Sequence, residues 1–129
     1  MVKGILVNVE NKTITEVEVG DFQDIQSKIG CRCFSVMNLG GGVDYFYDDE
    51  GLLKEAYVDD DGVKHNMVGV QLPNYPQVIM GNGLIMGHTE DGDSADCPVP
   101  LSAVESVITF VEYDNAEDRP QPQMGFISF

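Results

Sequence analysis

The stretch GILVNVENKTITEVEV, residues 4–19, decides the fold class of this chain. In its first half Ile5, Val7 and Val9 recur at every second position. In its second half Val17 and Val19 alternate with Glu16 and Glu18. A period of two is typical of β-strands, and the polar residues between the halves supply a turn. The stretch therefore predicts a β-hairpin.

A short helix is predicted directly after this hairpin. Asp21 can cap its first turn, and Gly30 can end it. Phe22, Ile25 and Ile29 fall on one helical stripe between those two residues. A helix of about two turns is not stable in isolation, so we expect its apolar stripe to pack on the sheet.

Short strands and turns are predicted along the remainder of the chain. Strands are expected at 33–37, 43–48 and 83–87, polar or glycine turns at 39–42 and 59–62, and a helical turn or loop at 52–56. Ser102 and Glu105 have capping-box spacing, but the following residues are β-branched, so a short helix running into a strand is equally consistent. We expect an α+β fold, with a mainly antiparallel sheet and one or two short helices packed on one face.

The length and composition indicate one globular domain. The chain has 129 residues, of which 43% are hydrophobic and 22% charged. We expect a compact domain over residues 1–115 and a proline-bearing tail over residues 116–129. Three cysteines, an odd number, argue against a disulfide framework. No apolar run approaches the roughly 18 residues of a membrane span and no signal-peptide pattern opens the chain, so we expect a cytoplasmic protein.

The charge balance is the unusual feature of the composition. Twenty-two acidic residues face seven basic ones, which leaves a formal net charge of −15. Eight acids and a single lysine lie between Asp44 and Asp61, and no Lys or Arg lies between His65 and Asp118. Direct binding to nucleic acid or to an anionic membrane is excluded, because both require clustered basic residues. The negative electrostatic field of a chain with this net charge attracts basic partners instead.

Four blocks of sequence, taken in order, identify a family resemblance. They are the blocks at Lys3–Val9 (KGILVNV), Asp48–Lys54 (DDEGLLK), Gly81–Gly87 (GNGLIMG) and Leu101–Glu105 (LSAVE). In this order and at these spacings the chain resembles, over roughly residues 3–108, a family of small proteins from bacteria, phages and plasmids known as domain of unknown function 3846. The resemblance implies a compact α+β fold and a mobile-element setting, and it supplies no catalytic residues.

The sequence carries no strong signal of a metal, catalytic or ligand site. The loop Asp91–Asp96 offers oxygen ligands but lacks the spacing of a calcium loop. The cysteines and histidines lack the paired spacing of a zinc site, and no motif of nucleophilic catalysis is present. We expect no metal, no cofactor and no enzyme activity. Gly81, Gly83 and Gly87 are expected to serve turns or close backbone packing.

The sequence thus favours a non-enzymatic interaction protein of a phage or mobile element. We expect its acidic and aromatic residues to bind and block a basic host protein that handles nucleic acid or acts in defence, the chain itself being a monomer or a small homo-oligomer. The expected partner-binding residues are Asp44, Tyr45, Tyr47, Asp48, Asp49, Glu50, Asp59, Asp60, Asp61, Glu90, Asp91 and Asp93. The alternative is a small-ligand- or metal-binding module that uses residues 81–96.

Overall fold

The computed structural model of the chain describes residues 1–51, 55–73, 75, 77–115 and 118–119. Most of the predicted helical turn or loop at 52–56, and most of the predicted tail at 116–129, lie outside the described residues. The elements in chain order are β1 (Val2–Asn8), β2 (Thr13–Val19), α1 (Phe22–Ile29), β3 (Phe34–Gly40), β4 (Val43–Asp48), β5 (Tyr57–Val58), β6 (Lys64–His65), β7 (Val68–Gln71), β8 (Ile79–Met80), β9 (Gly83–His88), β10 (Ser94–Ala95), α2 (Leu101–Val107) and β11 (Thr109–Glu112).

The predicted opening hairpin is confirmed. β1 and β2 pair antiparallel from Val2 opposite Val19 to Asn8 opposite Thr13. Lys12 ends the turn with a φ of 54°, in the left-handed region that few residues other than glycine enter. Because successive side chains point to opposite faces of a strand, Ile5 and Val7 join the core on one face of β1 and the Leu6 side chain packs on the other.

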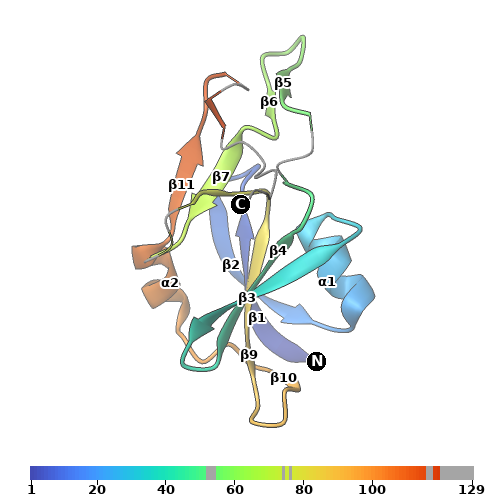
Figure 1. Ribbon diagram of the computed structural model, residues 1–129, viewed down its shortest axis with the longest axis vertical. Helices are drawn as coiled ribbons and strands as arrows, with labels where there is room; N and C mark the ends of the chain where they lie inside the picture. The colour runs from blue at the N-terminus through green and yellow to red at the C-terminus, as the bar shows by residue number, and fades with distance from the viewer. Residues whose placement is uncertain (52–54, 74, 76, 116–117, 120–129) are drawn as a thin grey trace, which may run out of the picture.

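The hairpin forms one side of a central sheet with strand order β2-β1-β9-β4-β3, and β10 pairs with the far end of β9 (Figure 1). Every strand pair in this sheet is antiparallel. β9 lies in the middle, between β1 and β4, and its residues from Gly83 to Gly87 are buried. The predicted strands at 43–48 and 83–87 are therefore confirmed, the first as β4 and the second within the central strand β9.

Helix α1 covers one face of the central sheet. The Asp21 carboxylate accepts the Asp24 N–H at 3.1 Å, and Gly30 ends the helix at a φ of 79°, so both predicted caps are confirmed. Ile25 and Ile29 are buried against Phe46 and other residues of the sheet. Phe22 departs from the predicted stripe: its side chain is 73% exposed, because position 22 opens the helix beyond the edge of the buried face.

A second sheet and α2 cover the opposite face. This sheet has the strand order β11-β7-β8 and is antiparallel throughout. Val70, Ile79 and Val104 from this layer pack against Ile5 and Tyr45 of the central sheet. The molecule is thus three layers deep, with a core on each face of the central sheet (Figure 1).

The predicted α+β class and mainly antiparallel pairing are confirmed. The helices, however, lie on opposite faces rather than on one, because β7, β8 and β11 form a layer that the sequence did not reveal. Of the two alternatives for this stretch, the short helix running into a strand is the one observed, as α2 and β11. The capping box is wrong: α2 begins one residue before Ser102, with Pro100 at its N-cap and no side-chain cap.

Candidate partner-binding site

The acidic residues predicted to bind a partner do not form one surface. Asp44 and Asp48 lie on β4, and Asp49 and Glu50 follow it. Asp59 to Asp61 form the turn of the β5–β6 hairpin (residues 57–65), whereas Glu90 to Asp93 lie in the turn between β9 and β10. The hairpin and the β9–β10 turn occupy opposite ends of the long axis (Figure 1). A partner of ordinary size therefore meets one of these acidic groups at a time.

Tyr45 must be removed from the predicted surface. Its side chain is 0% exposed and packs in the core beneath the second sheet. Burial raises the pKa of its phenol above the ordinary value of 10. Tyr47 stacks on Tyr45 with ring centroids 6.2 Å apart and is half-buried. Both aromatic residues are structural because β4 is covered on both faces.

Asp44 and Asp48 are also buried, and their carboxylates form hydrogen bonds within the protein. Asp44 Oδ2 lies 2.8 Å from His88 Nδ1 on the neighbouring strand β9. Asp48 is 6% exposed, and its Oδ1 accepts the Glu50 N–H at 2.9 Å. A carboxylate that is both buried and hydrogen-bonded inside the protein does not present its charge to a partner, so these two residues leave the predicted surface.

Asp49 and Glu50 lie at the surface but are engaged in local contacts. The Ser35 hydroxyl donates to Asp49 Oδ1 at 2.6 Å. Arg32 lies 3.4 Å from a Glu50 carboxylate oxygen, and this guanidinium is 87% exposed. Exposed ion pairs of this kind contribute little to stability. Arg32 offsets the charge of Glu50, whereas the Ser35 hydroxyl leaves the charge of Asp49 in place.

The β5–β6 hairpin is built around the carboxylate of Asp59. Its Oδ1 accepts the N–H groups of Asp61 and Val63, both at 2.9 Å. Its Oδ2 lies 2.9 Å from His65 Nε2, and the His65 ring stacks on Tyr57 with centroids 4.5 Å apart. The hydrogen bond with His65, followed by that from Val63, holds the pKa of Asp59 below its ordinary value. Asp59 thus orders the turn.

Asp60 and Asp61 remain as exposed carboxylates at the tip of this hairpin. Tyr57, Val58 and Val63 flank them, and these side chains are 47%, 50% and 51% exposed. Large apolar side chains beside a polar rim are the ordinary composition of a protein-binding surface. The predicted partner-binding residues include none of these three apolar side chains, although their position on either side of the turn Asp59–Gly62 was a usable signal.

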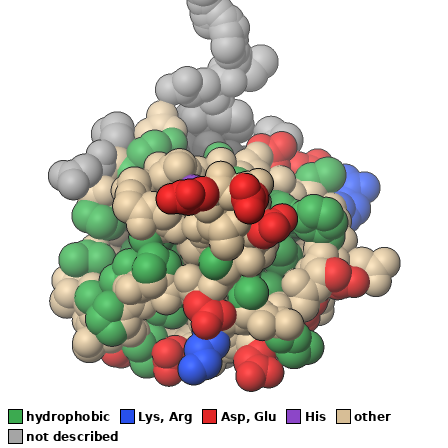
Figure 2. Space-filling model, turned by 90° about the horizontal axis from the view of Figure 1, so that it is seen from below, with side chains coloured by type: hydrophobic (Ala, Val, Ile, Leu, Met, Phe, Trp, Pro, Cys, Tyr) green, Lys and Arg blue, Asp and Glu red, His purple; other side chains and the backbone are tan. Residues whose placement is uncertain are grey.

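The β9–β10 turn carries charge without a comparable apolar surface. Glu90, Asp91 and Asp93 are exposed there, and the Thr89 hydroxyl accepts the Asp93 N–H at 3.2 Å. None of the exposed large hydrophobic residues in the described part of the chain belongs to this turn. Figure 2, which shows this end, has its acidic side chains spread out among uncharged and hydrophobic ones. The hairpin is therefore the better partner site.

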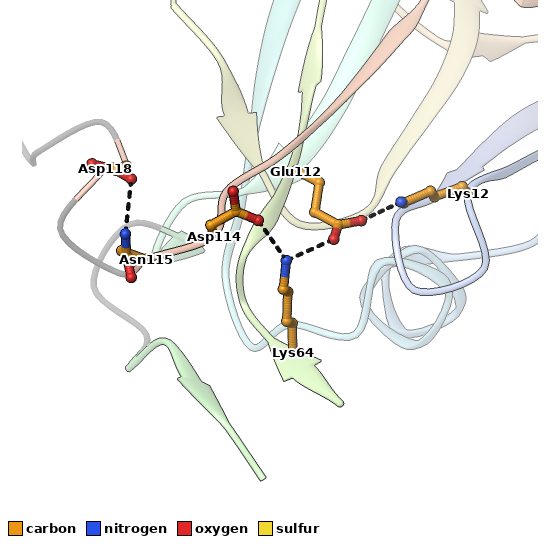
Figure 3. Close-up of polar contacts among 6 residues, drawn as sticks. All are labelled: Lys12, Lys64, Glu112, Asp114, Asn115 and Asp118. Atoms are coloured by element: carbon orange, nitrogen blue, oxygen red, sulfur yellow. Dashed lines mark hydrogen bonds and ion pairs between the residues drawn. The ribbon is translucent and has the colours of Figure 1, made fainter. Parts of the chain in front are cut away.

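Lys12, Lys28, Arg32 and Lys64 lie in ion pairs with carboxylates, but the 22 acidic residues far outnumber the seven basic ones, so the net charge stays at −15. Glu112 on β11 pairs with both Lys12 and Lys64, and Lys64 also lies 3.0 Å from Asp114 (Figure 3). Lys12 first, and then Lys64, lower the pKa of Glu112 to about 2, and the two carboxylates raise the pKa of Lys64. The network joins the first turn, the hairpin and β11.

The described residues contain neither a membrane-spanning helix nor a cluster of metal ligands. Neither helix combines the length and the apolar composition that crossing a membrane requires. No three His, Cys, Asp or Glu side chains in this part of the chain come together in a way that could hold a metal ion. Cys31, Cys33 and Cys97 are free thiols.

Comparison with known proteins supplies a family. No curated protein and no solved structure matches the chain. A family model described as a domain of unknown function, DUF3846, matches residues 2–108. This match includes every helix and strand from β1 to α2 and ends before β11. The chain therefore belongs to the DUF3846 family.

Proposed function

We propose that this chain is a non-enzymatic binding protein of a phage or other mobile element, which acts in the cytoplasm of the host cell. Its β5–β6 hairpin binds a basic surface on a host protein that handles nucleic acid or serves in defence. Binding occupies a site that otherwise contacts phosphate. The observation that carries this proposal is the combination at one hairpin of exposed Tyr57, Val58 and Val63 with the carboxylates of Asp60 and Asp61.

Charge and apolar contact have separate roles in this proposal. The net charge of −15 attracts a basic partner from a distance and raises the association rate. The apolar side chains at the hairpin then exclude water at the contact, where most of the binding energy of protein interfaces arises. The charges alone would bind weakly and without selectivity, because salt screens them over about 8 Å at physiological ionic strength.

The test is a comparison of three tagged proteins in pull-downs from host lysate, eluted with increasing salt. The wild type is compared with the D60N/D61N variant at the hairpin and with the D91N/D93N variant at the opposite end. Both variants remove two charges, so they share the same change in net charge. We expect a basic partner bound in stoichiometric amount. The D60N/D61N variant should release it at lower salt than the wild type, and the D91N/D93N variant should release it at the same salt as the wild type.

A V58S/V63S variant separates apolar contact from charge. We expect it to weaken binding of the same partner about fivefold or more, as truncation of a central interface residue does, while leaving the salt dependence unchanged. If the D91N/D93N variant weakens binding and the hairpin variants do not, the proposed site is wrong. Binding that is insensitive to salt would overturn the proposal that a basic surface is recognised.

A further inference from the structure

Strand β3 forms one edge of the central sheet. In the strand order β2-β1-β9-β4-β3 it pairs with β4 on one side, and among the described residues no strand pairs with it on the other side. An exposed edge presents backbone N–H and C=O groups that can pair with a further strand. Proteins protect such edges with charged side chains, proline, bulges or a covering element, and the two edges of this sheet differ in that protection.

The protection is strong at β2 and weak at β3. β2 carries the exposed acids Glu16 and Glu18, and helix α2 contacts the same strand. β3, from Phe34 to Gly40, contains no charged residue and no proline. A bulge between Asn38 and Gly40 disturbs only the end of the strand. The regular part of this edge, residues 34–38, is therefore open to a partner strand.

The pairing with β4 shows which backbone groups of β3 point outward. The Asp49 N–H donates to the Cys33 carbonyl oxygen at 3.2 Å, so these two residues form a hydrogen-bonded pair. Hydrogen-bonded and non-hydrogen-bonded pairs alternate along antiparallel strands. Every second residue from Cys33 onward therefore directs its backbone groups to β4, whereas Phe34, Val36 and Asn38 direct theirs away from the sheet. These outward groups are centred on Val36.

An apolar surface lies beside this edge, on the α1 face of the sheet. The Val36 side chain is 50% exposed, and Val36 lies opposite Phe46, which belongs to the core beneath α1. Phe22, at the start of α1, is 73% exposed, and its ring centroid lies 6.1 Å from that of Phe34. Large apolar side chains that gather at the surface, rather than lying singly, mark an interaction site.

Charge decides which partner fits this surface. A basic partner, which the acidic hairpin attracts, would meet no carboxylate side chain along β3. On α1, which borders the surface, the Asp24 carboxylate is paired with Lys28 at 2.8 Å. An uncharged strand edge suits a partner edge that is also uncharged, because neither edge then loses the hydration of a charged group. The β3 edge of a second copy of this chain meets that requirement.

We propose that two copies of this chain associate through β3, with the two strands antiparallel about a two-fold axis at Val36. In this register Phe34 of one copy lies opposite Asn38 of the other, so the outward backbone groups of both strands pair with each other. The paired segment ends before the bulge at Gly40. The axis is perpendicular to the sheet, so Val36 and Phe22 of both copies lie on the same face and extend the apolar contact.

The net charge gives this dimer a characteristic salt dependence. Two copies that each carry a charge of −15 repel each other at long range, and salt screens that repulsion. The contact itself consists of backbone hydrogen bonds and apolar side chains, so we expect added salt to strengthen dimerisation. Binding of a basic partner by the β5–β6 hairpin weakens with salt instead. The two proposals therefore respond in opposite directions, and either can fail without the other.

Sedimentation velocity tests the proposal from micromolar to millimolar protein, at low and at physiological salt. The wild type is compared with V36K at the edge and with V58K on β5 as the matched control. Both valines are 50% exposed, and both substitutions add one positive charge. In V36K two ammonium groups would meet at the axis, where like charges are destabilising. We expect a wild-type dimer that V36K weakens about tenfold or more and V58K does not weaken.

Amide hydrogen exchange locates the contact in the wild type. Exchange of the Val36 N–H should slow as protein concentration rises, whereas that of the Met37 N–H, which already faces β4, should not change. A chain that stays monomeric at every concentration and salt would overturn the proposal, as would a dimer that V36K and V58K weaken equally. If the wild type is monomeric and V36K loses a host protein in the pull-down, the edge binds that protein and the dimer is wrong.

Discussion

Tyr45 and Gly83 approach each other so closely that no side chain fits between them. A Cβ atom at Gly83 would lie 1.9 Å from the Tyr45 hydroxyl oxygen and 2.1 Å from its Cζ atom. Gly83 opens the central strand β9, and Tyr45 lies on the adjacent strand β4. Because Tyr45 is 0% exposed, its ring has no room to withdraw. Gly83 is therefore required by packing, as the sequence suggested for the glycines of this segment.

Replacement of Gly83 by alanine should destabilise the protein by about 1–3 kcal/mol, the usual cost of overpacking a core. Urea unfolding measures this change. Gly20→Ala is the matched control, because a Cβ atom at Gly20 would make only ordinary contact with Asp24, at 3.5 Å, and should change stability by less than about 0.5 kcal/mol. Equal effects of the two substitutions would show that the Tyr45 contact does not govern the Gly83 position.

Substitution of Tyr45 by phenylalanine should leave stability unchanged or raise it by about 1 kcal/mol. The Tyr45 hydroxyl is buried with no hydrogen-bond partner among the described residues, and an unpaired buried polar group costs desolvation energy that no interaction offsets. Thermal unfolding of Y45F and of Y47F, whose ring is only half-buried, gives the comparison. A clear loss of stability in Y45F alone would mean that the hydroxyl has a partner in solution, such as a bound water.

The parts of the fold that local patterns encode were predictable. The alternation in β1 and β2 and the caps of α1 at Asp21 and Gly30 depend on neighbours in sequence. The pairing of Ile5 with Ile85 across the centre of the sheet does not, because no local signal specifies which distant strand is adjacent. For the same reason the layer of β7, β8 and β11, and with it the placement of α2 opposite α1, could not be read from the sequence.

For a related reason, the sequence locates only one part of the proposed partner site. Composition located the acidic turn at Asp59–Asp61, which the structure places on a projecting hairpin. Tyr45 was predicted to face a partner, but it and its neighbour Phe46 are both buried, because each face of β4 has its own core. The continuous apolar run of Leu84 to Met86 was the available signal for a sheet covered on both faces.

The ion network at Glu112 makes stability depend on pH in the acid range. The pKa of Glu112 is lowered from 4.5 to about 2 in the folded protein, so the carboxylate stabilises the fold above its unfolded pKa, and this contribution disappears as pH falls through about 2. We expect Glu112→Gln to lower the melting temperature at pH 7, and the curves of variant and wild type to converge as pH falls from about 4.5 toward 2.

The control for this measurement is Glu105→Gln, which removes one exposed negative charge on α2 and therefore the same amount of self-repulsion. Added salt should reduce the Glu112→Gln effect, since the paired side chains are partly exposed. A melting difference between E112Q and wild type that stays constant down to pH 2 would contradict the assignment of the low pKa to this network.

The order of the β5–β6 hairpin should depend on Asp59 far more than on Asp60. Asp59→Ala removes the acceptor for the N–H groups of Asp61 and Val63 and the contact with His65. Asp59→Asn keeps an oxygen acceptor but loses the charge. Hydrogen exchange at the Asp61 and Val63 amides should therefore be fastest in D59A, intermediate in D59N and slowest in the wild type, with D60A close to the wild type.

The stacking of Tyr57 on His65 supplies a second readout, since ring-current shifts vanish when the rings separate. The pKa of Asp59 is lowered in the fold, so the stabilisation of the turn by its carboxylate is present above the unfolded pKa and is lost as pH falls through the folded value. The exchange rates of the wild-type amides, corrected for intrinsic exchange, should therefore approach the D59A rates on acidification. Equal protection in D59A and D60A would show that the turn does not depend on this carboxylate.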